Sequence, residues 1–322
     1  MHNLENELTH NLKNELHHKY LNNEIVHINS ENEIVHKGMK FISKNFEDED
    51  IESLKEYLEV EGFASLNLMK SMSKENIIEV IDKAGLRERN SSAHNIAKKF
   101  RSLINEKNIE KAVVCSIDDK SLRDLTLLEK DSFRVLEGMI IAGNIIEASE
   151  GYIYLGKTYP DLNRKVEKYI NELFREGLLG EQFKIKVVYE KLNEKTLKTK
   201  ENHAICINNI ETLAVLPTLF SADLYTYLEN GTKESRGTKL INILGDVNEP
   251  GVYEIPFGVT LRDIVYEVGK GIFEDKRFKF MMLCEEEDSI ITENLLNIKY
   301  TYEDLSKYGL KVCSEIVVMS DN

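Results

Sequence analysis

Residues 137–160, EGMIIAGNIIEASEGYIYLGKTYP, decide the fold, because they join the longest apolar run of the chain to a strand pattern. Between residues 135 and 148, apolar side chains fall on almost every face of a helix. This predicts a buried helix, one too short to span a membrane. Gly151 interrupts the helical pattern, and residues 152–155 have the β-branched and aromatic bias of an interior strand. We therefore expect a core helix that leads into a core strand.

The flanking segments extend this pair into a βαβαβ unit. Residues 112–115 are a short apolar strand before the core helix, and residues 183–187 alternate apolar and lysine side chains as an edge strand does. The helix between the last two strands begins after Pro160 and ends at Gly177. Its apolar face is spaced 4, 3 and 4 residues apart: Leu162, Val166, Tyr169, Leu173. This order predicts an α/β fold with parallel strands.

A helical lead-in precedes this unit. Residues 48–60 place Ile51, Leu54 and Leu58 on one helical face, and residues 73–85 form a second helix that Gly85 ends. A third amphipathic helix is expected from residue 91 to residue 105, with Ser91 or Ser92 as its N-cap.

The C-terminal part has the pattern of a small α+β module. Residues 239–244 and 252–255 are strands around a Pro-Gly turn. Thr260 and Asp263 form a capping box at the start of a helix that Gly269 ends. We expect a β-grasp arrangement, in which the sheet packs on this helix. The four acids at 285–288 favour a solvated turn over a calcium loop, because alternating ligands and a central glycine are lacking.

Composition excludes several functions. The chain has 322 residues, 42% of them hydrophobic, with a net charge of -14, so nothing favours a nucleic-acid backbone as partner. The four cysteines are scattered without a CxxC pair, which argues against zinc and iron–sulfur sites and fits a reducing compartment. With no leader and no apolar run of membrane length, we expect a cytoplasmic protein without direct membrane insertion.

Residues 1–36 form a low-complexity tail that is rich in Asn, Glu and His. Six of the eight histidines of the chain lie there: His2, His10, His17, His18, His27 and His36. Imidazole is a common metal ligand, but the polar spacing favours a weakly ordered, solvated tail, so we expect no metal site.

Three blocks resemble the NADH-oxidising FMN flavoprotein subunit (51 kDa type) of respiratory complex I and NAD(P)-linked hydrogenases. They are the EGMIIA, GYIY and GLLG run within 137–180, the INNIETL motif at 207–213, and GTKLINILGDVNEPGVYEIPFGVTLRDIV at 237–265. The resemblance implies a flavoprotein-like domain at 37–235, which would bind FMN and NADH. It also implies a soluble ligand-binding β-grasp domain at 236–322. The family's iron–sulfur helical domain is expected to be absent, and with it any iron–sulfur cluster.

The family's nucleotide-cradling loop, GRGGAGFPTGLKW, aligns with residues 88–100 without a gap, yet every glycine is replaced. The replaced positions are 88, 90, 91, 93 and 97. Phosphate cradles need glycine, because backbone N–H groups must approach the anion closely, and a carboxylate at Glu88 would repel phosphate. We therefore favour a plain helix over a working cradle.

Five residues are possible remnants of the family's cofactor site: Arg89, Lys99, Asp118, Asn208 and Asn209. Asp118 and Asp119 favour a turn over acid–base or metal chemistry, because adjacent side chains diverge. The two asparagines either meet the flavin or cap the helix that starts at Ile210, and the sequence leaves both open. Residues 193–197 are a possible remnant of the nicotinamide side of the site.

The hypothesis is a degenerate paralogue that acts as a structural or interaction subunit of an electron-transfer complex beside an iron–sulfur protein. The alternative is an active oxidoreductase, in which FMN takes hydride from NADH and passes electrons to that partner. A weaker alternative is a scaffolding or ligand-binding role of the β-grasp domain alone.

Overall fold

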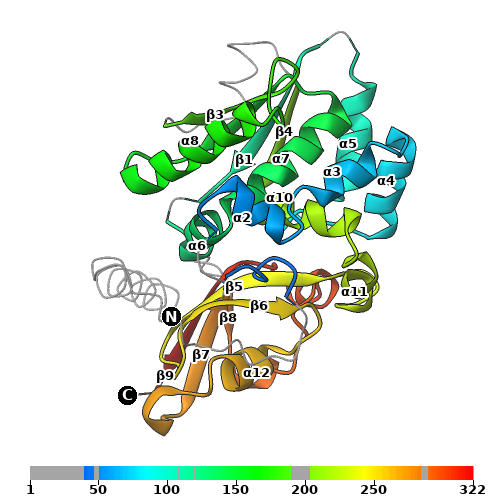
Figure 1. The fold of residues 1–322 in the computed structure, drawn as a ribbon. Helices are drawn as coiled ribbons and strands as arrows, with labels where there is room; N and C mark the ends of the chain where they lie inside the picture. Colours follow the sequence, from blue (N-terminus) through cyan, green and yellow to red (C-terminus); the bar gives the residue numbers. More distant parts are fainter. Residues whose placement is uncertain are drawn as a thin grey trace.

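The computed structural model describes residues 40–46, 51–107, 109–118, 120–189, 204–283 and 289–321. Four sequence predictions lie wholly or partly outside these ranges: those for the 1–36 tail, Asp119, the 193–197 remnant and the acids at 285–288. The described chain forms two lobes, each built on its own β-sheet (Figure 1). Among the described residues, no helix combines the length and the apolar character that crossing a membrane would require.

The first lobe contains a four-stranded sheet in the order β3-β2-β1-β4. Its strands are β1 (Lys111–Ser116), β2 (Glu150–Tyr154), β3 (Lys184–Val188) and β4 (Ala204–Asn209). Every neighbouring pair is parallel. The βαβαβ order predicted this for β1, β2 and β3, whereas strand β4 was not predicted. The alternating strand β3 lies at one edge of the sheet, which confirms that expectation as well.

Helices α5 (Ile96–Asn105), α7 (Ser132–Ile146) and α8 (Pro160–Arg175) pack against this sheet. The core helix α7 is buried along nearly its whole length, as predicted. Gly138 lets α7 approach α10 (Ile210–Val215), because a Cβ at that position would lie 2.0 Å from the Leu213 carbonyl oxygen. Gly177, at φ +72°, ends α8 in the left-handed conformation that the sequence predicted.

Shorter helices complete the first lobe: α2 (Leu54–Glu59), α3 (Ala64–Met69), α4 (Lys74–Lys83), α6 (Leu122–Lys130), η1 (Leu216–Phe220) and α11 (Leu224–Glu229). The predicted α4 is confirmed, with Ser73 as its N-cap. The predicted inward face of α2 is partly wrong, because Leu58 is 50% exposed and Tyr57 is buried instead. The capping box of Ser53 starts this short helix at Leu54, so positions 54 and 57 face the core.

The second lobe is a mixed five-stranded sheet in the order β6-β5-β9-β7-β8. Its strands are β5 (Thr238–Gly245), β6 (Gly251–Pro256), β7 (Phe278–Leu283), β8 (Ile290–Ile291) and β9 (Glu315–Ser320). Its helical segments are α12 (Leu261–Asp263), η2 (Ile264–Val268), η3 (Phe273–Asp275), η4 (Glu293–Leu295) and α13 (Tyr302–Ser306). The predicted capping box of Thr260 and Asp263 is present, and the sheet packs on α12 and η2 around a second apolar core. The fold is therefore α/β followed by an α+β β-grasp module.

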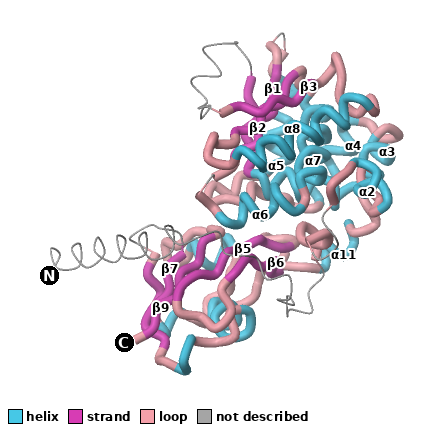
Figure 2. The backbone as a smooth tube through the Cα atoms, turned by 60° about the vertical axis from the view of Figure 1, so that its left-hand side comes forward, coloured by secondary structure: helices cyan, strands magenta, loops and turns pink. Residues whose placement is uncertain are grey.

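The lobes meet where α6 packs against β5 and β6 (Figure 2). The N-terminal residues 41–43 also join the two lobes. The carboxylate of Glu254 on β6 accepts the backbone N–H groups of Phe41, Ile42 and Ser43 at 2.8–3.2 Å. The segment that follows reaches the first lobe, where the Asn45 amide donates to Asp131 at 2.7 Å.

Candidate functional site

The first lobe has one sheet edge at which a ligand site is expected. The chain runs from β1 to β2 to β3 on one side and returns to β4 on the other side of β1. The direction of winding therefore reverses between β1 and β4. In open α/β sheets, ligands bind at the carboxyl ends of the strands beside such a reversal. The residues that follow β1 and β4 form this edge, which we call the β1–β4 edge.

A closed loop, residues 87–95, lies beside the β1–β4 edge. Arg87 and Asn95 form an antiparallel bridge at its base. Within it, the backbone N–H of Glu88 donates to the His94 carbonyl at 2.8 Å. Ala93 has φ +49°, in the left-handed region that favours glycine. The loop therefore has a left-handed backbone at residue 93, one of the positions where the resembling family has glycine.

The predicted helix start at residue 91 is wrong. Helix α5 begins at Ile96, and the side chain of Asn95 is its N-cap. Ser91 and Ser92 cap nothing, because they lie in a turn in which the Asn90 side chain accepts the N–H of Ser92 at 3.0 Å. Asn and Ser form such local hydrogen bonds in competition with a helix.

Glu88 binds three of the five predicted cofactor residues. One carboxylate oxygen accepts the backbone N–H of Asn209 at 2.6 Å. The other accepts the Lys99 ammonium and the Asn208 amide, each at 3.1 Å. Lys99 also donates to the carbonyl of Ile207 on β4. The Glu88 side chain is 3% exposed and that of Lys99 is 25% exposed. Ile207 and Asn209 are half-buried, so solvent reaches the rim of this cluster but hardly touches the carboxylate.

The two asparagines therefore have separate roles. Asn209 is the N-cap of α10, because its side chain accepts the N–H of Glu211 at 3.0 Å. Asn208 is fully buried and donates to Glu88. Of the two alternatives left open by the sequence, capping describes Asn209 but not Asn208.

Arg89 and Asp118 lie apart from the Glu88 cluster. The buried Arg89 guanidinium donates to the Tyr227 hydroxyl and the Arg236 carbonyl, each at 2.9 Å, and lies 5.0 Å from the centre of the Phe257 ring. It therefore ties the first lobe to the second. Asp118 is exposed in a turn, where it accepts the N–H of Lys120, as the turn prediction expected. Asp119 lies outside the described residues.

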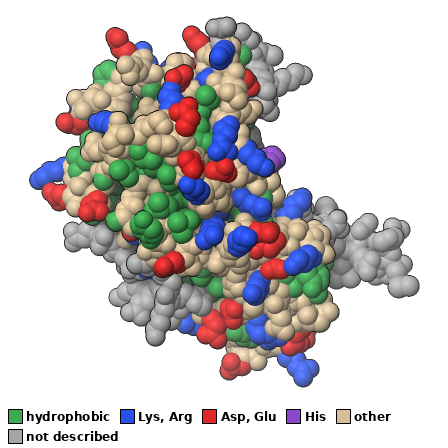
Figure 3. Space-filling model, turned by 90° about the vertical axis from the view of Figure 1, so that its right-hand side faces the viewer, with side chains coloured by type: hydrophobic (Ala, Val, Ile, Leu, Met, Phe, Trp, Pro, Cys, Tyr) green, Lys and Arg blue, Asp and Glu red, His purple; other side chains and the backbone are tan. Residues whose placement is uncertain are grey.

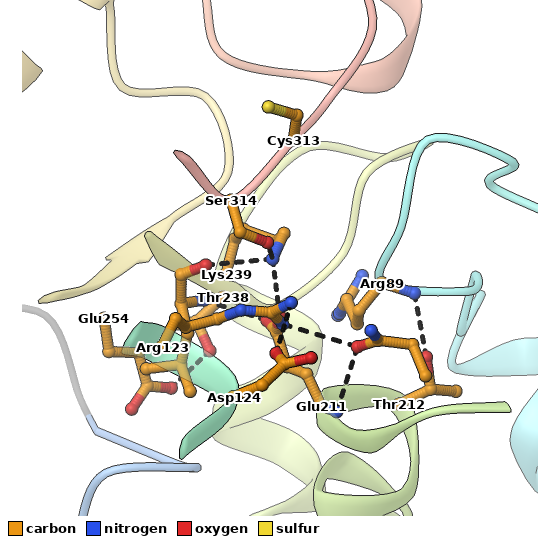
Figure 4. A network of polar contacts seen from close by, with 12 residues as sticks. Arg89, Arg123, Asp124, Glu211, Thr212, Thr238, Lys239, Glu254, Cys313 and Ser314 are labelled. Atoms are coloured by element: carbon orange, nitrogen blue, oxygen red, sulfur yellow. Dashed lines mark hydrogen bonds and ion pairs between the residues drawn. The ribbon is translucent and has the colours of Figure 1, made fainter. Parts of the chain in front are cut away.

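A second buried cluster, centred on Glu211, joins the lobes (Figure 4). The Glu211 carboxylate accepts from Arg123 at 2.6 Å, from the N–H of Leu240 at 2.8 Å and from the Lys239 ammonium. Arg123 also pairs with Asp124 at 2.5 Å. Two cations and two carboxylates thus balance one another in the interface.

The Glu211 cluster is sealed from water, because the side chains of Glu211 and Lys239 are both 0% exposed. Burial lowers the pKa of Lys239 to about 8, although the negative charge of Glu211 opposes this shift. The carboxylate of Glu315 on β9 closes the same face by accepting the Ser121 hydroxyl at 2.7 Å. The second lobe therefore covers the β1–β4 edge.

Sequence reasoning missed Glu211 and Lys239 and did not foresee the contacts of Glu88. Glu211 and Lys239 lie inside the two family-like blocks at 207–213 and 237–265, which was a usable signal. Glu88 was noted only as a charge that would repel phosphate. Its partners Asn208 and Asn209 are 120 and 121 residues away, so no local pattern could reveal them.

An open groove of about 800 Å³ lies between α4 and α5, away from this edge. Its acidic residues Glu75, Glu79 and Asp82 are matched by Lys74, Lys83 and Arg101. Arg101 pairs with Asp82, and Lys83 pairs with Glu79. Figure 3, which turns the right-hand side of Figure 1 to the viewer, shows acidic and basic side chains interspersed on that face. The groove therefore has no net preference for an anion.

The residues present at the β1–β4 edge do not fit a flavin phosphate. Glu88 already uses the ammonium, the amide and the backbone N–H that a phosphate would need, and its negative charge would repel a second anion. Ala97, at another of the replaced glycine positions, turns its methyl group into the core and is 0% exposed. A second anion has no place beside these three groups while Glu88 holds them.

Comparisons with known proteins show that the chain is similar to subunits of redox complexes. It is 25% identical over 306 residues to the NADP-reducing hydrogenase subunit HndC of Solidesulfovibrio fructosivorans, covering 84% of this chain and 62% of that protein. It is 27% identical over 264 residues to the F subunit of the NADH-quinone oxidoreductase of Aquifex aeolicus, covering 71% of this chain and 62% of that protein. The chain thus spans about 62% of the length of these two relatives.

The fold also matches a solved structure. A chain of an NAD+-reducing [NiFe]-hydrogenase in the air-oxidised state aligns with a TM-score of 0.65 and 19% identity, covering 80% of this chain and 50% of that one. No protein-family model matches the sequence.

Proposed function

We propose that this chain, a divergent homologue of the 51 kDa-type flavoprotein subunits of complex I and NAD(P)-linked hydrogenases, is a non-catalytic member of that group. It acts as a structural or interaction subunit of an electron-transfer complex, beside an iron–sulfur protein, and oxidises little or no NADH. In this proposal, residues 37–235 keep the flavoprotein architecture and residues 236–322 form the β-grasp unit.

The observation that carries the proposal is the position of the Glu88 carboxylate. It takes up Lys99, Asn208 and the Asn209 amide at the edge where a cofactor is expected. The second lobe supports the proposal, because its Lys239 and Glu315 contact the residues that follow β4 and β1. An edge filled by the chain's own side chains favours a scaffold over a cofactor enzyme.

An absorbance spectrum of the purified full-length chain tests the proposal. We expect no flavin band above background, both as purified and after incubation with excess FMN followed by desalting, with free FMN as the concentration standard. Stoichiometric flavin that NADH bleaches under anaerobic conditions would overturn the proposal. The interaction role requires, in addition, that an iron–sulfur protein copurify with the tagged chain from its native cell.

The alternative is an active FMN-dependent NADH oxidoreductase that passes electrons to a partner's cluster. One observation favours it: Lys99, Asn208 and Asn209 converge on one spot, although 109 residues separate Lys99 from Asn208 in the sequence. This alternative predicts a flavin spectrum in the wild type that weakens in Lys99→Ala and Asn209→Ala. Unchanged flavin loading in both variants would remove it.

A further inference from the structure

The geometry around Glu88 points to a use of its carboxylate beyond filling space. We propose that Glu88 is a built-in anion that occupies an intact oxyanion site. The donors of that site are the Lys99 ammonium, the Asn208 amide and the Asn209 backbone N–H. The ligand class is a phosphate or phosphate monoester, which Glu88 replaces within the same chain. This inference rests on the proposed function, in which the wild-type edge takes up no phosphate.

The three donors suit an oxyanion. A carboxylate and a phosphate both accept hydrogen bonds through oxygens that share a negative charge, and a lysine with neutral N–H donors is a common combination for binding either group. The distances of 2.6, 3.1 and 3.1 Å to Glu88 are those of hydrogen bonds to a charged acceptor. The donors therefore already point at one negative group.

Each donor is also held by a contact that does not involve Glu88. Lys99 donates to the Ile207 carbonyl, the Asn208 side-chain oxygen accepts from the Cys206 thiol at 3.0 Å, and the Asn209 side chain caps α10. Removal of the carboxylate would therefore leave the donors in place. A preorganised site of this kind binds its ligand without the cost of ordering the donors.

The backbone of Glu88 is fixed independently of its side chain. Its N–H donates to the His94 carbonyl at 2.8 Å, and its own carbonyl accepts the Tyr302 hydroxyl at 3.0 Å. Truncation at Cβ would therefore empty the site without moving the loop. The partly exposed Lys99 gives a small anion a route inward.

Titration calorimetry with inorganic phosphate tests the inference on full-length Glu88→Ala, the wild type and the double variant Glu88→Ala/Lys99→Ala. We expect Glu88→Ala to bind phosphate at least tenfold more tightly than either reference. Equal affinity in Glu88→Ala and the wild type would overturn the inference, and so would equal affinity in the single and double variants.

Thermal unfolding keeps the test decisive if Glu88→Ala is unstable. The midpoint temperature of unfolding is measured while phosphate replaces chloride at constant ionic strength. Because phosphate stabilises many proteins by exclusion from their surfaces, Glu137→Ala serves as the matched control. Glu137 is another buried carboxylate of the first lobe, and its partners are the neutral donors Tyr57, Phe63 and Ser65. We expect phosphate to raise the midpoint temperature of Glu88→Ala, or to restore its folding, to a greater extent than it does for Glu137→Ala. Equal responses of the two variants would overturn the inference.

Binding experiments with FMN and riboflavin distinguish a phosphate monoester from free phosphate as the ligand. If FMN binds Glu88→Ala and inorganic phosphate displaces it, while riboflavin does not bind, the site takes a phosphate monoester. If phosphate binds and FMN does not, the site takes the free ion. Flavin in the purified wild type would instead overturn the proposed function, so the two failures are distinguishable.

Discussion

Two buried carboxylates lie at the start of α10: Glu211 belongs to its first turn, and Glu88 accepts the backbone N–H of its N-cap, Asn209. They differ in what surrounds them. Glu211 joins two cations, Arg123 and Lys239, in an interface where neither its side chain nor that of Lys239 reaches water. Glu88 joins one cation, Lys99, which is 25% exposed, and two neutral N–H donors. The first cluster holds the lobes together, and the second lies where a ligand is expected.

Under the proposed function, the two clusters contribute to the protein in different ways. A sealed cluster cannot exchange its ions with solutes, so it contributes only to stability. A cluster with one partly exposed cation can respond to an anion once its own carboxylate is removed. The Glu211 and Glu88 clusters should therefore differ most when each carboxylate is neutralised in turn.

The largest effect is expected for Glu211→Gln. The amide keeps the shape but leaves Arg123 and Lys239 buried with Asp124 as the remaining carboxylate of the cluster. Breaking a buried ion pair in this way costs about 3–5 kcal/mol. Urea unfolding monitored by circular dichroism measures the loss, and hydrogen exchange in β5 reports whether the lobes loosen. A loss below about 1 kcal/mol would mean that the cluster does not hold the lobes together.

The second-largest expected effect is the pH dependence of the free energy of unfolding that buried Lys239 causes. Folding lowers the pKa of Lys239 from 10.5 to about 8, so the unfolded chain binds more protons between these values. The cost of burying the charged lysine is therefore fully present below pH 8 and is relieved as the pH rises toward 10.5. Relative to that of Lys239→Met, the free energy of unfolding of the wild type should rise by about 2–3 kcal/mol between pH 7 and pH 10. Urea unfolding of both proteins at several pH values measures this difference, and a constant difference would contradict it.

Glu88→Gln is the matched counterpart of Glu211→Gln. It should lower the free energy of unfolding by a smaller amount, about 1–2 kcal/mol. Lys99 loses its carboxylate but keeps the Ile207 carbonyl and has access to water. The same urea experiment measures both variants. If Glu88→Gln is as costly as Glu211→Gln, solvent access does not distinguish the two clusters.

The local architecture of both clusters could be predicted from the sequence, but their contacts could not. Helix α7, strand β2 and the capping box of Thr260 follow from hydrophobic period and capping chemistry, which act within a few residues. The pairing of Glu88 with Asn208 spans 120 residues and depends on how β4 and the 87–95 loop meet. Family resemblance located Lys99, Asn208 and Asn209 but could not indicate that Glu88 would take them.

The start of α5 was mispredicted for a related reason. Amphipathic spacing of Ile96, Phe100 and Leu103 is genuine, and all three are buried, but it does not fix where the helix begins. The Asn90 turn and the Arg87–Asn95 bridge fix that point, and both depend on side-chain and backbone pairing that periodicity does not encode. The result is a loop that presents Glu88 to its partners.

The smallest expected effect tests this loop, through two positions where the resembling family has glycine. Ala93 holds a left-handed φ of +49°, which strains an L-residue, so Ala93→Gly should stabilise the protein by about 0.5–1 kcal/mol after the greater entropy of the unfolded chain is counted. Ala97 is helical and fully buried, so the control Ala97→Gly should destabilise it by about 1 kcal/mol or more. Urea unfolding should therefore give opposite signs for the two variants. A destabilising effect of both substitutions would contradict a strained left-handed backbone at Ala93 in the loop beside Glu88.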